Sequence, residues 1–234
     1  MVASKKKGKR YTTGAIIVAA GASRRMRGED KLFTSLGGKP LLARVIDAFD
    51  SCKAIGQIVI VLRAEKLAET RQMMMKHGWS TEIDICVGGK RRQDSVLAGL
   101  DRLDEWQWVV VHDGARPLVT TDLINRGLKA AMETGAAAAA VPVTDTIKVA
   151  GADRVVWHTP SREDLWAAQT PQVFRRDIIA EAYRQGKSNV TDDASLVEQL
   201  GYPVKLYRGS YDNMKVSTPD DLVLAEALWR KRQE

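Results

Sequence analysis

The chain has 234 residues, of which 44% are hydrophobic and 28% are charged, and its net charge is +7 at neutral pH. These values are ordinary for a folded globular protein with one sizeable core, so they exclude a wholly disordered chain, and no apolar run reaches the roughly 18 residues of a membrane-spanning helix. Two cysteines and three histidines, scattered along the sequence, form neither a disulfide framework nor a zinc signature, which favours a reducing, cytoplasmic compartment.

The first residues are strongly basic, because residues 4–10 hold five cations. No apolar signal-peptide core follows them. We expect a disordered basic tail over residues 1–12 and a single domain over residues 13–234. A nucleic-acid-binding arm is the alternative for the tail, but we favour a solvated arm with no nucleic-acid partner.

Apolar β-branched runs alternate with helical patterns from residue 16 to residue 143. Continuously apolar strands that are separated by helices predict a mostly parallel sheet covered on both faces, which is a doubly wound α/β fold. We expect strands at 16–18, 58–62, 83–87, 108–112 and 136–143, and helices over 41–49, 64–77, the segment after residue 95, and 121–134. The cluster Met73–Met75 is interpreted as core filler.

The alternation of strands and helices stops between residues 144 and 168. Residues 145–149 and 154–158 alternate like strands, and 150–153 have turn composition, which predicts a β-hairpin arm. An isolated hairpin is marginal in water. We therefore expect the arm to pack against a second chain, and the alternative is a hairpin that lies on its own domain.

The rest of the chain returns to the domain. Residues 169–174 lead into a helix over 176–185, and a strand follows at 204–207. Thr191 or Asp192 is a plausible cap for a further helix. Thr218-Pro219 starts a last helix, over 221–231, with proline at its first position.

Three loops with unusual composition each follow a predicted strand. They contain Ala19, Ala20 and Gly21 after the first strand, residues 88–95 after the third, and residues 113–117 after the fourth. Because function in such a sheet lies at the carboxyl ends of the strands, the three loops can converge on one crevice. Small residues let backbone N–H groups approach phosphate oxygens, and the nearby arginines and lysines supply positive charge.

Phosphoryl or nucleotidyl transfer needs this combination of groups, with a carboxylate such as Asp113 to help hold Mg²⁺. Other chemistries are excluded, because the chain has no Ser–His–Asp order, no Cys–His pair and no Walker A sequence. A dinucleotide-dependent oxidoreductase is a rival class, but the first loop lacks the Gly-x-Gly-x-x-Gly fingerprint.

A series of short motifs, in order from about residue 14 to residue 228, resembles the 2-C-methyl-D-erythritol 4-phosphate cytidylyltransferase family. The resemblance implies a Rossmann-like nucleotidyltransferase fold with a protruding β-hairpin arm. The motifs are Ala19-Ala20-Gly21-Ala22-Ser23-Arg24-Arg25-Met26, Lys31, Gly88-Gly89 with Arg92 and Asp94-Ser95-Val96, residues 111–117, 145–148, 169–172, 191–193 and 212–215.

The resemblance also implies a role for individual residues. Arg25, Lys31 and Lys215 would surround the α-phosphate of CTP as catalytic residues, and Asp113 would face the metal, Mg²⁺, and the ribose. The remaining CTP-binding residues would be Ala19, Ala20, Gly21 and Ser23 at the phosphates, Gly89 and Ser95 at the cytosine, and Gly114 and Arg116 as support for the Asp113 loop.

The acceptor side of the site is implied in the same way. Thr146, Arg162, Thr170 and Thr191 match positions that bind methylerythritol phosphate, and the arm over residues 144–168 would supply part of that site to the neighbouring subunit of a homodimer. The reaction implied is CMP transfer from CTP by direct in-line attack. A ribitol 5-phosphate cytidylyltransferase is the alternative, because it resembles this family in every motif on the CTP side.

Overall fold

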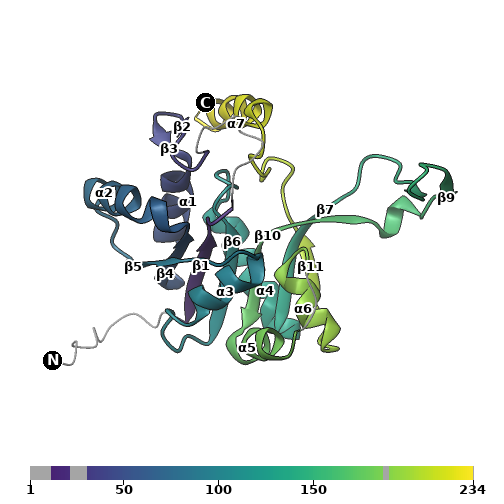
Figure 1. The fold of residues 1–234 in the computed structure, drawn as a ribbon, viewed down its shortest axis with the longest axis horizontal. Coiled ribbons are helices and arrows are strands. Elements are labelled where there is room, and N and C mark those ends of the chain that lie inside the picture. The colour runs from purple at the N-terminus through teal and green to yellow at the C-terminus, as the bar shows by residue number, and fades with distance from the viewer. Residues whose placement is uncertain (1–11, 22–30, 187–189, 234) are drawn as a thin grey trace.

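The computed structural model describes residues 12–21, 31–186 and 190–233, and a seven-stranded sheet forms its centre (Figure 1). Four of the pairings between neighbouring strands are parallel, and the two pairings of β10 are antiparallel. The doubly wound, mostly parallel α/β fold is therefore confirmed. In spatial order the strands are β11 (Lys205–Arg208), β7 (Ala136–Pro142), β10 (Trp166–Arg175), β6 (Trp108–Asp113), β1 (Thr13–Val18), β4 (Ile55–Leu62) and β5 (Glu82–Val87).

Both faces of the sheet are buried, which is why its strands are apolar without interruption. Successive side chains of a strand point to opposite faces, so Ala15 and Ile17 join one core and Ile16 joins the other. The first core packs against α1 (Leu41–Asp50), α2 (Leu67–His77) and α4 (Thr121–Thr134), and the second packs against α3 (Arg92–Leu100), α5 (Arg176–Gln185) and α6 (Asp193–Gln199).

The helix starts follow the capping residues of the sequence. The Asp192 side chain accepts from the backbone N–H of Ser195 and caps α6, as expected for this motif. Thr218 and Asp221 form a capping box at the start of α7 (Pro219–Lys231), where Pro219 occupies the first turn. The polar motifs therefore fix where these two helices enter the fold.

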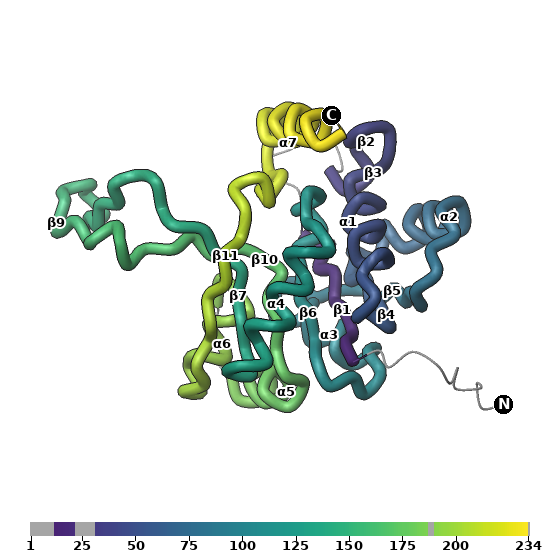
Figure 2. The backbone as a smooth tube through the Cα atoms, turned by 180° about the vertical axis from the view of Figure 1, so that it is seen from behind, coloured from purple at the N-terminus to yellow at the C-terminus, as the bar shows by residue number. Residues whose placement is uncertain are grey.

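A third, smaller core joins the two ends of the chain. Helix α7 packs against the short hairpin of β2 (Ser35–Leu36) and β3 (Lys39–Pro40), where Leu36 and Ala225 are fully buried. The Arg44 guanidinium lies 3.8 Å from the centre of the Trp229 ring, in a cation–π arrangement. Figure 2 shows α7 beside this hairpin, seen from behind. The segments that carry Lys31 and Lys215 thus share one support.

Strand β10 lies inside the sheet, between β7 and β6, although its sequence predicts only a segment that leads back to the domain. It pairs with β6 through Gln172–Arg175 and with β7 on its other side, and the register shifts between Ala168 and Gln172. The peptide bond between Thr170 and Pro171, inside that shift, is cis. Glutamines and a proline hide a central strand from an analysis that relies on apolar runs.

The predicted arm is a hairpin with shorter strands than expected. Its strands are β8 (Val149–Ala150) and β9 (Val156–His158), because the turn between them extends to Val155. Arg154 has a φ of 63° within this turn. Figure 1 shows the arm projecting from the body of the molecule. Three apolar side chains near its end, those of Val155, Val156 and Trp157, are 60%, 50% and 71% exposed.

Two further expectations concern single segments. The predicted helix over 64–77 begins as a 3₁₀ turn, Ala64–Lys66, before α2. Met73 is buried as expected of core filler, but Met75 is 78% exposed, so that interpretation is wrong for Met75.

Of the predicted tail over residues 1–12, only Thr12 belongs to the described residues. Within the described part of the chain, no helix combines the length and the apolar character that crossing a membrane requires.

Candidate functional site

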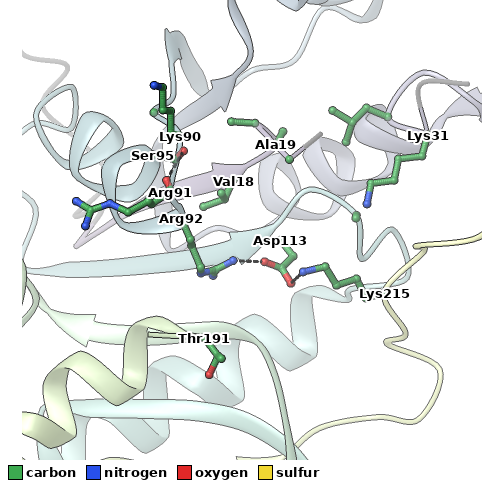
Figure 3. A pocket seen from close by; sticks show the side chains of 15 residues that line it. Val18, Ala19, Lys31, Lys90, Arg91, Arg92, Ser95, Asp113, Thr191 and Lys215 are labelled. Carbon is green, nitrogen blue, oxygen red and sulfur yellow. Dashed lines mark hydrogen bonds and ion pairs between the residues drawn. The ribbon is translucent and has the colours of Figure 1, made fainter. Parts of the chain in front are cut away.

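A cavity of about 260 Å³ lies where the predicted loops meet at the carboxyl ends of the strands (Figure 3). Among the described residues, five cationic side chains and one carboxylate line it, so the cavity suits an anionic ligand. The lining residues are Val18, Ala19, Ala20, Gly21, Lys31, Leu32, Gly89, Lys90, Arg91, Arg92, Ser95, Asp113, Ala115, Thr191 and Lys215.

Asp113, the last residue of β6, is the centre of charge in this cavity. Its carboxylate lies 2.5 Å from Arg92 Nη1, 2.9 Å from Lys215 Nζ and 3.4 Å from Arg116 Nε. Burial raises the pKa of Asp113, but the three cations lower it more, so its pKa stays well below the ordinary value. Asp113 is therefore ionised and holds Arg92 and Lys215 in place (Figure 3).

Arg92 connects the cavity to a buried layer behind it. Its Nη2 lies 2.7 Å from Oδ2 of Asp193, and the Tyr183 hydroxyl donates to the same carboxylate. Asp193 is 1% exposed. Burial lowers the pKa of Arg92, whereas Asp193 and Asp113 raise it by more. Burial and the Asp193 charge together raise the pKa of Tyr183 above its ordinary value. The chain Tyr183–Asp193–Arg92–Asp113 thus links α5 and α6 to the end of β6.

Lys31 and Lys215 enter the site from opposite ends of the sequence. Lys31 Nζ donates to the carbonyl oxygen of Val216 at 3.1 Å, and the backbone N–H of Val216 donates to the carbonyl of Ala115. In Figure 3 the Lys31 side chain points down toward the pair of Asp113 and Lys215. The structure thus brings the two predicted lysines together beside the Asp113 carboxylate of the cavity.

The glycine loop before α3 has no room for side chains. A Cβ atom on Gly89 would lie 2.2 Å from Cβ of Asp94, and one on Gly88 would lie 2.6 Å from the Ser95 hydroxyl oxygen. Glycine therefore lets the loop fold back on the first turn of α3. The Ser95 hydroxyl is 3.2 Å from the carbonyl oxygen of Arg91, and Ser95 remains at the cavity wall.

Most of the predicted site residues line the cavity, and the others fall into four groups. Gly114 and Arg116 lie behind the wall: the Gly114 N–H donates to Val18, and Arg116 Nη1 donates to the carbonyl of Asn213. Thr170 is 4% exposed and is not a lining residue. Thr146 and Arg162 are exposed on the arm. Ser23 and Arg25 lie outside the described residues.

Several residues of the site were not among the predicted ones. Arg92 and Asp193 stand in sequence motifs without a predicted role in the site, and Tyr183 stands in none of the motifs. Buried carboxylates are rare unless they are paired. Nothing in the sequence, however, relates Asp193 to Arg92, which precedes it by 101 residues. His112 is fully buried beside Asp113, and in the sequence it stands at the end of an apolar strand, within the motif of residues 111–117, without a predicted role in the site.

The described residues offer Asp113 as the only carboxylate that lines the cavity, and they hold no group of three or more metal-ligating side chains. Mg²⁺ often keeps several waters and is held by one or two carboxylates together with substrate phosphates. The residues present therefore fit a magnesium ion that binds mainly to a triphosphate, rather than one held by protein ligands alone.

The sequence of this chain matches one known protein family over most of its length. The family model described as 2-C-methyl-D-erythritol 4-phosphate cytidylyltransferase matches residues 13–231. A relative of that name from Dehalococcoides mccartyi is 48% identical over 218 residues, which cover 93% of this chain and 96% of the relative. A relative of the same name from Bacillus velezensis is 44% identical over 220 residues, covering 92% and 94% of the two chains.

Two solved structures have the same fold as this chain. The crystal structure of 4-diphosphocytidyl-2C-methyl-D-erythritol synthase from Anaerococcus prevotii superposes with a TM-score of 0.84 at 29% identity, covering 93% of this chain and 98% of that chain. The crystal structure of 2-C-methyl-D-erythritol 4-phosphate cytidylyltransferase from Thermus thermophilus superposes with a TM-score of 0.75 at 33% identity, covering 92% of this chain and 98% of that chain. The chain therefore belongs to the 2-C-methyl-D-erythritol 4-phosphate cytidylyltransferase family.

Proposed function

We propose that this protein transfers CMP from CTP to 2-C-methyl-D-erythritol 4-phosphate, a step in the non-mevalonate synthesis of isoprenoid precursors. The observation that carries the proposal is the cationic cavity around Asp113, formed where three strand-end loops meet in a chain of this family. The products are 4-diphosphocytidyl-2-C-methyl-D-erythritol and pyrophosphate.

The reaction follows from charge. A phosphate oxygen of the acceptor attacks the α-phosphorus of CTP and forms a new P–O bond, while the bond from that phosphorus to the bridging oxygen breaks and pyrophosphate leaves with its electron pair. Both reactants are anions. The protein's contribution is therefore mainly neutralisation and alignment rather than proton transfer.

The lysines of the cavity are placed to supply that neutralisation. We propose Lys31 and Lys215 as catalytic residues at the α-phosphate, with Arg25 as a third. This is supported by the Lys31 contact with Val216 and the Lys215 ion pair with Asp113. We assign the triphosphate to the loop of Ala19, Ala20 and Gly21, and the cytosine to Gly89 and Ser95, all of which line the cavity.

We propose Mg²⁺ as the cofactor, with Asp113 as its protein contact. When bound, the ion would neutralise triphosphate charge. Because both carboxylate oxygens of Asp113 already pair with cations, Oδ1 with Arg92 and Oδ2 with Lys215, the ion would take most of its ligands from phosphate groups and water. The lysines and Arg92 hold the phosphate groups whether or not a metal accompanies them.

The acceptor site is proposed to be shared between two copies of the chain. Thr191 lines the cavity, but Thr146 and Arg162 lie on the projecting arm, where Arg162 Nη1 donates to the carbonyl of Thr144. The exposed apolar side chains of the arm support a homodimer in which each arm reaches its neighbour.

Cys52 and Cys86 bear on where the protein works. Both are buried free thiols, and burial raises the pKa of each thiol. Thiols that need no oxidising environment suit a reducing compartment, and we propose a cytoplasmic location.

The experiment that tests the function is pyrophosphate release from CTP and Mg²⁺ with methylerythritol phosphate, with ribitol 5-phosphate, and with no acceptor. The comparisons give the ribitol alternative no support. We expect rapid release with methylerythritol phosphate only. Equal release with both acceptors would contradict the substrate but leave the reaction class intact, and no release with either would contradict both.

A further inference from the structure

His112, the residue before Asp113 in β6, is fully buried and has a hydrogen-bond partner for each ring nitrogen. Nδ1 lies 3.0 Å from the hydroxyl oxygen of Thr170, and Nε2 lies 3.2 Å from the carbonyl oxygen of Arg116. The ring packs against Phe49, with 5.3 Å between the ring centres. Neither the proposed reaction nor the apolar core explains why an imidazole, rather than an apolar ring, occupies this position.

The partners determine the direction of each hydrogen bond. The Arg116 carbonyl can only accept, so Nε2 carries the proton and donates. In a neutral ring, Nδ1 then accepts, and the Thr170 hydroxyl is its donor. The same hydroxyl oxygen accepts from the backbone N–H of Asp113 at 3.0 Å. Burial lowers the pKa of His112 to about 3, which agrees with a neutral ring.

We propose that His112 is a positioning residue for cytidylyl transfer, which fixes both ends of the turn from Asp113 to Arg116 through Thr170 and the Arg116 carbonyl. The inference rests on the proposed function. It adds a residue that touches neither substrate, and it gives Thr170 a second task besides the predicted contact with the acceptor.

The turn controls the charges of the cavity. One end carries the Asp113 carboxylate, which pairs with Lys215, and the other end carries Arg116, whose guanidinium donates to the Asn213 carbonyl in the segment that leads to Lys215. A shift of the turn therefore displaces Lys215 through two contacts: the ion pair with Asp113, and the hydrogen bond from Arg116 to the carbonyl of Asn213. A displacement of about 1 Å at a reacting centre is enough to cost on the order of 10²-fold in rate.

The two hydrogen bonds of the Thr170 hydroxyl determine which kind of hydrogen bond it can still make with a ligand. Its proton is committed to His112 and one lone pair to Asp113, so Thr170 can only accept a hydrogen bond from a ligand. A ligand hydroxyl satisfies that requirement, whereas a phosphate dianion does not.

Two substitutions separate the two hydrogen bonds of the ring. In His112→Asn the side-chain amide can reach the Nδ1 position and keep the contact with Thr170, and in His112→Gln it can reach the Nε2 position and keep the contact with Arg116. We expect each to lower kcat by about 10-fold to 10²-fold with a small change in KM for CTP, and His112→Phe, which keeps the ring packing, to lower it most. His77→Asn, on α2 away from the cavity, is the matched control and should leave kcat unchanged.

A readout independent of turnover is the ¹⁵N spectrum of His112 in the whole wild-type protein, which we expect to show the proton on Nε2. Hydrogen exchange at the Asp113 amide should accelerate in His112→Gln but not in His112→Asn, a pattern that general destabilisation does not produce. A proton on Nδ1, or folded variants with wild-type kcat, overturns the proposal.

If the His112 variants fail to fold, Thr170→Val and Thr170→Ser test the proposal instead. Serine keeps the hydroxyl group that bonds His112, and valine does not. We expect Thr170→Ser to retain most of kcat and Thr170→Val to lose it, and equal kcat values for the two overturn the proposal. Failure of the proposed function is distinguishable: wild-type protein would then release no pyrophosphate with either acceptor, while the tautomer and amide exchange would still be measured.

Discussion

The cavity around Asp113 and the arm between β7 and β10 are built in opposite ways. The Asp113 side chain is 8% exposed and has three cationic partners from its own chain, whereas Trp157 on the arm is 71% exposed. The described residues of a single chain therefore form the proposed triphosphate-binding half of the site. Among the described residues nothing covers the apolar side chains near the end of the arm, which is why we propose that the arm packs against a second copy of the chain.

The energy of the two regions has different sources. In the cavity, ion pairs to the buried Asp113 carboxylate hold a charged arrangement, and removal of its cationic partners would leave that carboxylate uncompensated. On the arm, each large apolar side chain that becomes fully buried contributes about 1.5–3 kcal/mol to association. The catalytic half should therefore respond to changes of charge, and the arm to changes of apolar area.

The sharpest test of the cavity is Lys31→Ala. We expect kcat to fall by about 10²–10³-fold, as for the loss of one preorganised charge contact, while KM for CTP changes far less. Steady-state kinetics measure both. Lys39→Ala, which removes a surface ion pair with Asp47, is the control and should leave both constants unchanged. A rise in KM alone would show that Lys31 binds CTP without stabilising the transition state.

Mixing two inactive variants tests whether the arm completes its neighbour's cavity. Arg162→Ala and Lys215→Ala should each have little activity, but a mixed dimer has one site with neither substitution. After exchange of subunits in an equal mixture, about a quarter of the wild-type activity should return, because half of the dimers are mixed. Activity no greater than the mean of the two separate variants would show that Arg162 serves its own subunit.

Acid should weaken the cavity region more than the arm. The folded-state pKa of His112 is lowered to about 3, so between that value and the ordinary value of about 6.5 the unfolded chain binds a proton that the folded chain does not. The free energy of unfolding should therefore fall as the pH falls from 6.5, by up to about 1.4 kcal/mol per pH unit.

Urea unfolding between pH 7 and pH 5 measures this slope. His112→Gln should lack this component of the slope, whereas His158→Gln on the exposed arm should keep it. Asp113, whose pKa is depressed, contributes stability that is present above about pH 4 and lost below it. Equal slopes in wild type and His112→Gln would contradict a buried neutral imidazole.

The smallest effect is expected for Trp157→Ser in the isolated subunit. Because Trp157 is largely exposed, the free energy of unfolding at protein concentrations that favour monomer should change by less than about 0.5 kcal/mol. Trp108→Ser, at a buried position of β6, should cost about 3–5 kcal/mol. Sedimentation should show weaker dimerisation for Trp157→Ser only. Similar losses of stability for both would indicate an arm packed on its own domain.

Much of the sheet could be predicted from the sequence, because strands buried on both faces are apolar at every position, as in Val109–Val111. The capping motifs at Asp192 and Thr218 located two helix starts. The sequence does not predict strand β10, because its polar residues and its proline interrupt both an apolar run and an alternating pattern. The arm strands are shorter than predicted, since alternation continues into a turn that backbone hydrogen bonds close at Val155.

The site was predictable where its chemistry is local. Loops that follow strands converge at one edge of a parallel sheet, so residues such as Gly21, Gly89 and Asp113 could be assigned to one crevice before their distances were known. The partners of Asp113 could not be assigned in this way. Arg92 joins Asp193 across 101 positions, and only the fold brings the two together.

The small core under α7 has a consequence for the order in which the enzyme matures during synthesis. Leu36 and Leu41 come from the first fifth of the chain, and Val216 and Ala225 come from its last residues. The strands of the sheet can assemble as they leave the ribosome, but the segment with Lys215 gains its support only when α7 has been made. A nascent chain that already contains the glycine loops and Asp113 therefore still lacks the packing that supports the proposed catalytic residue Lys215.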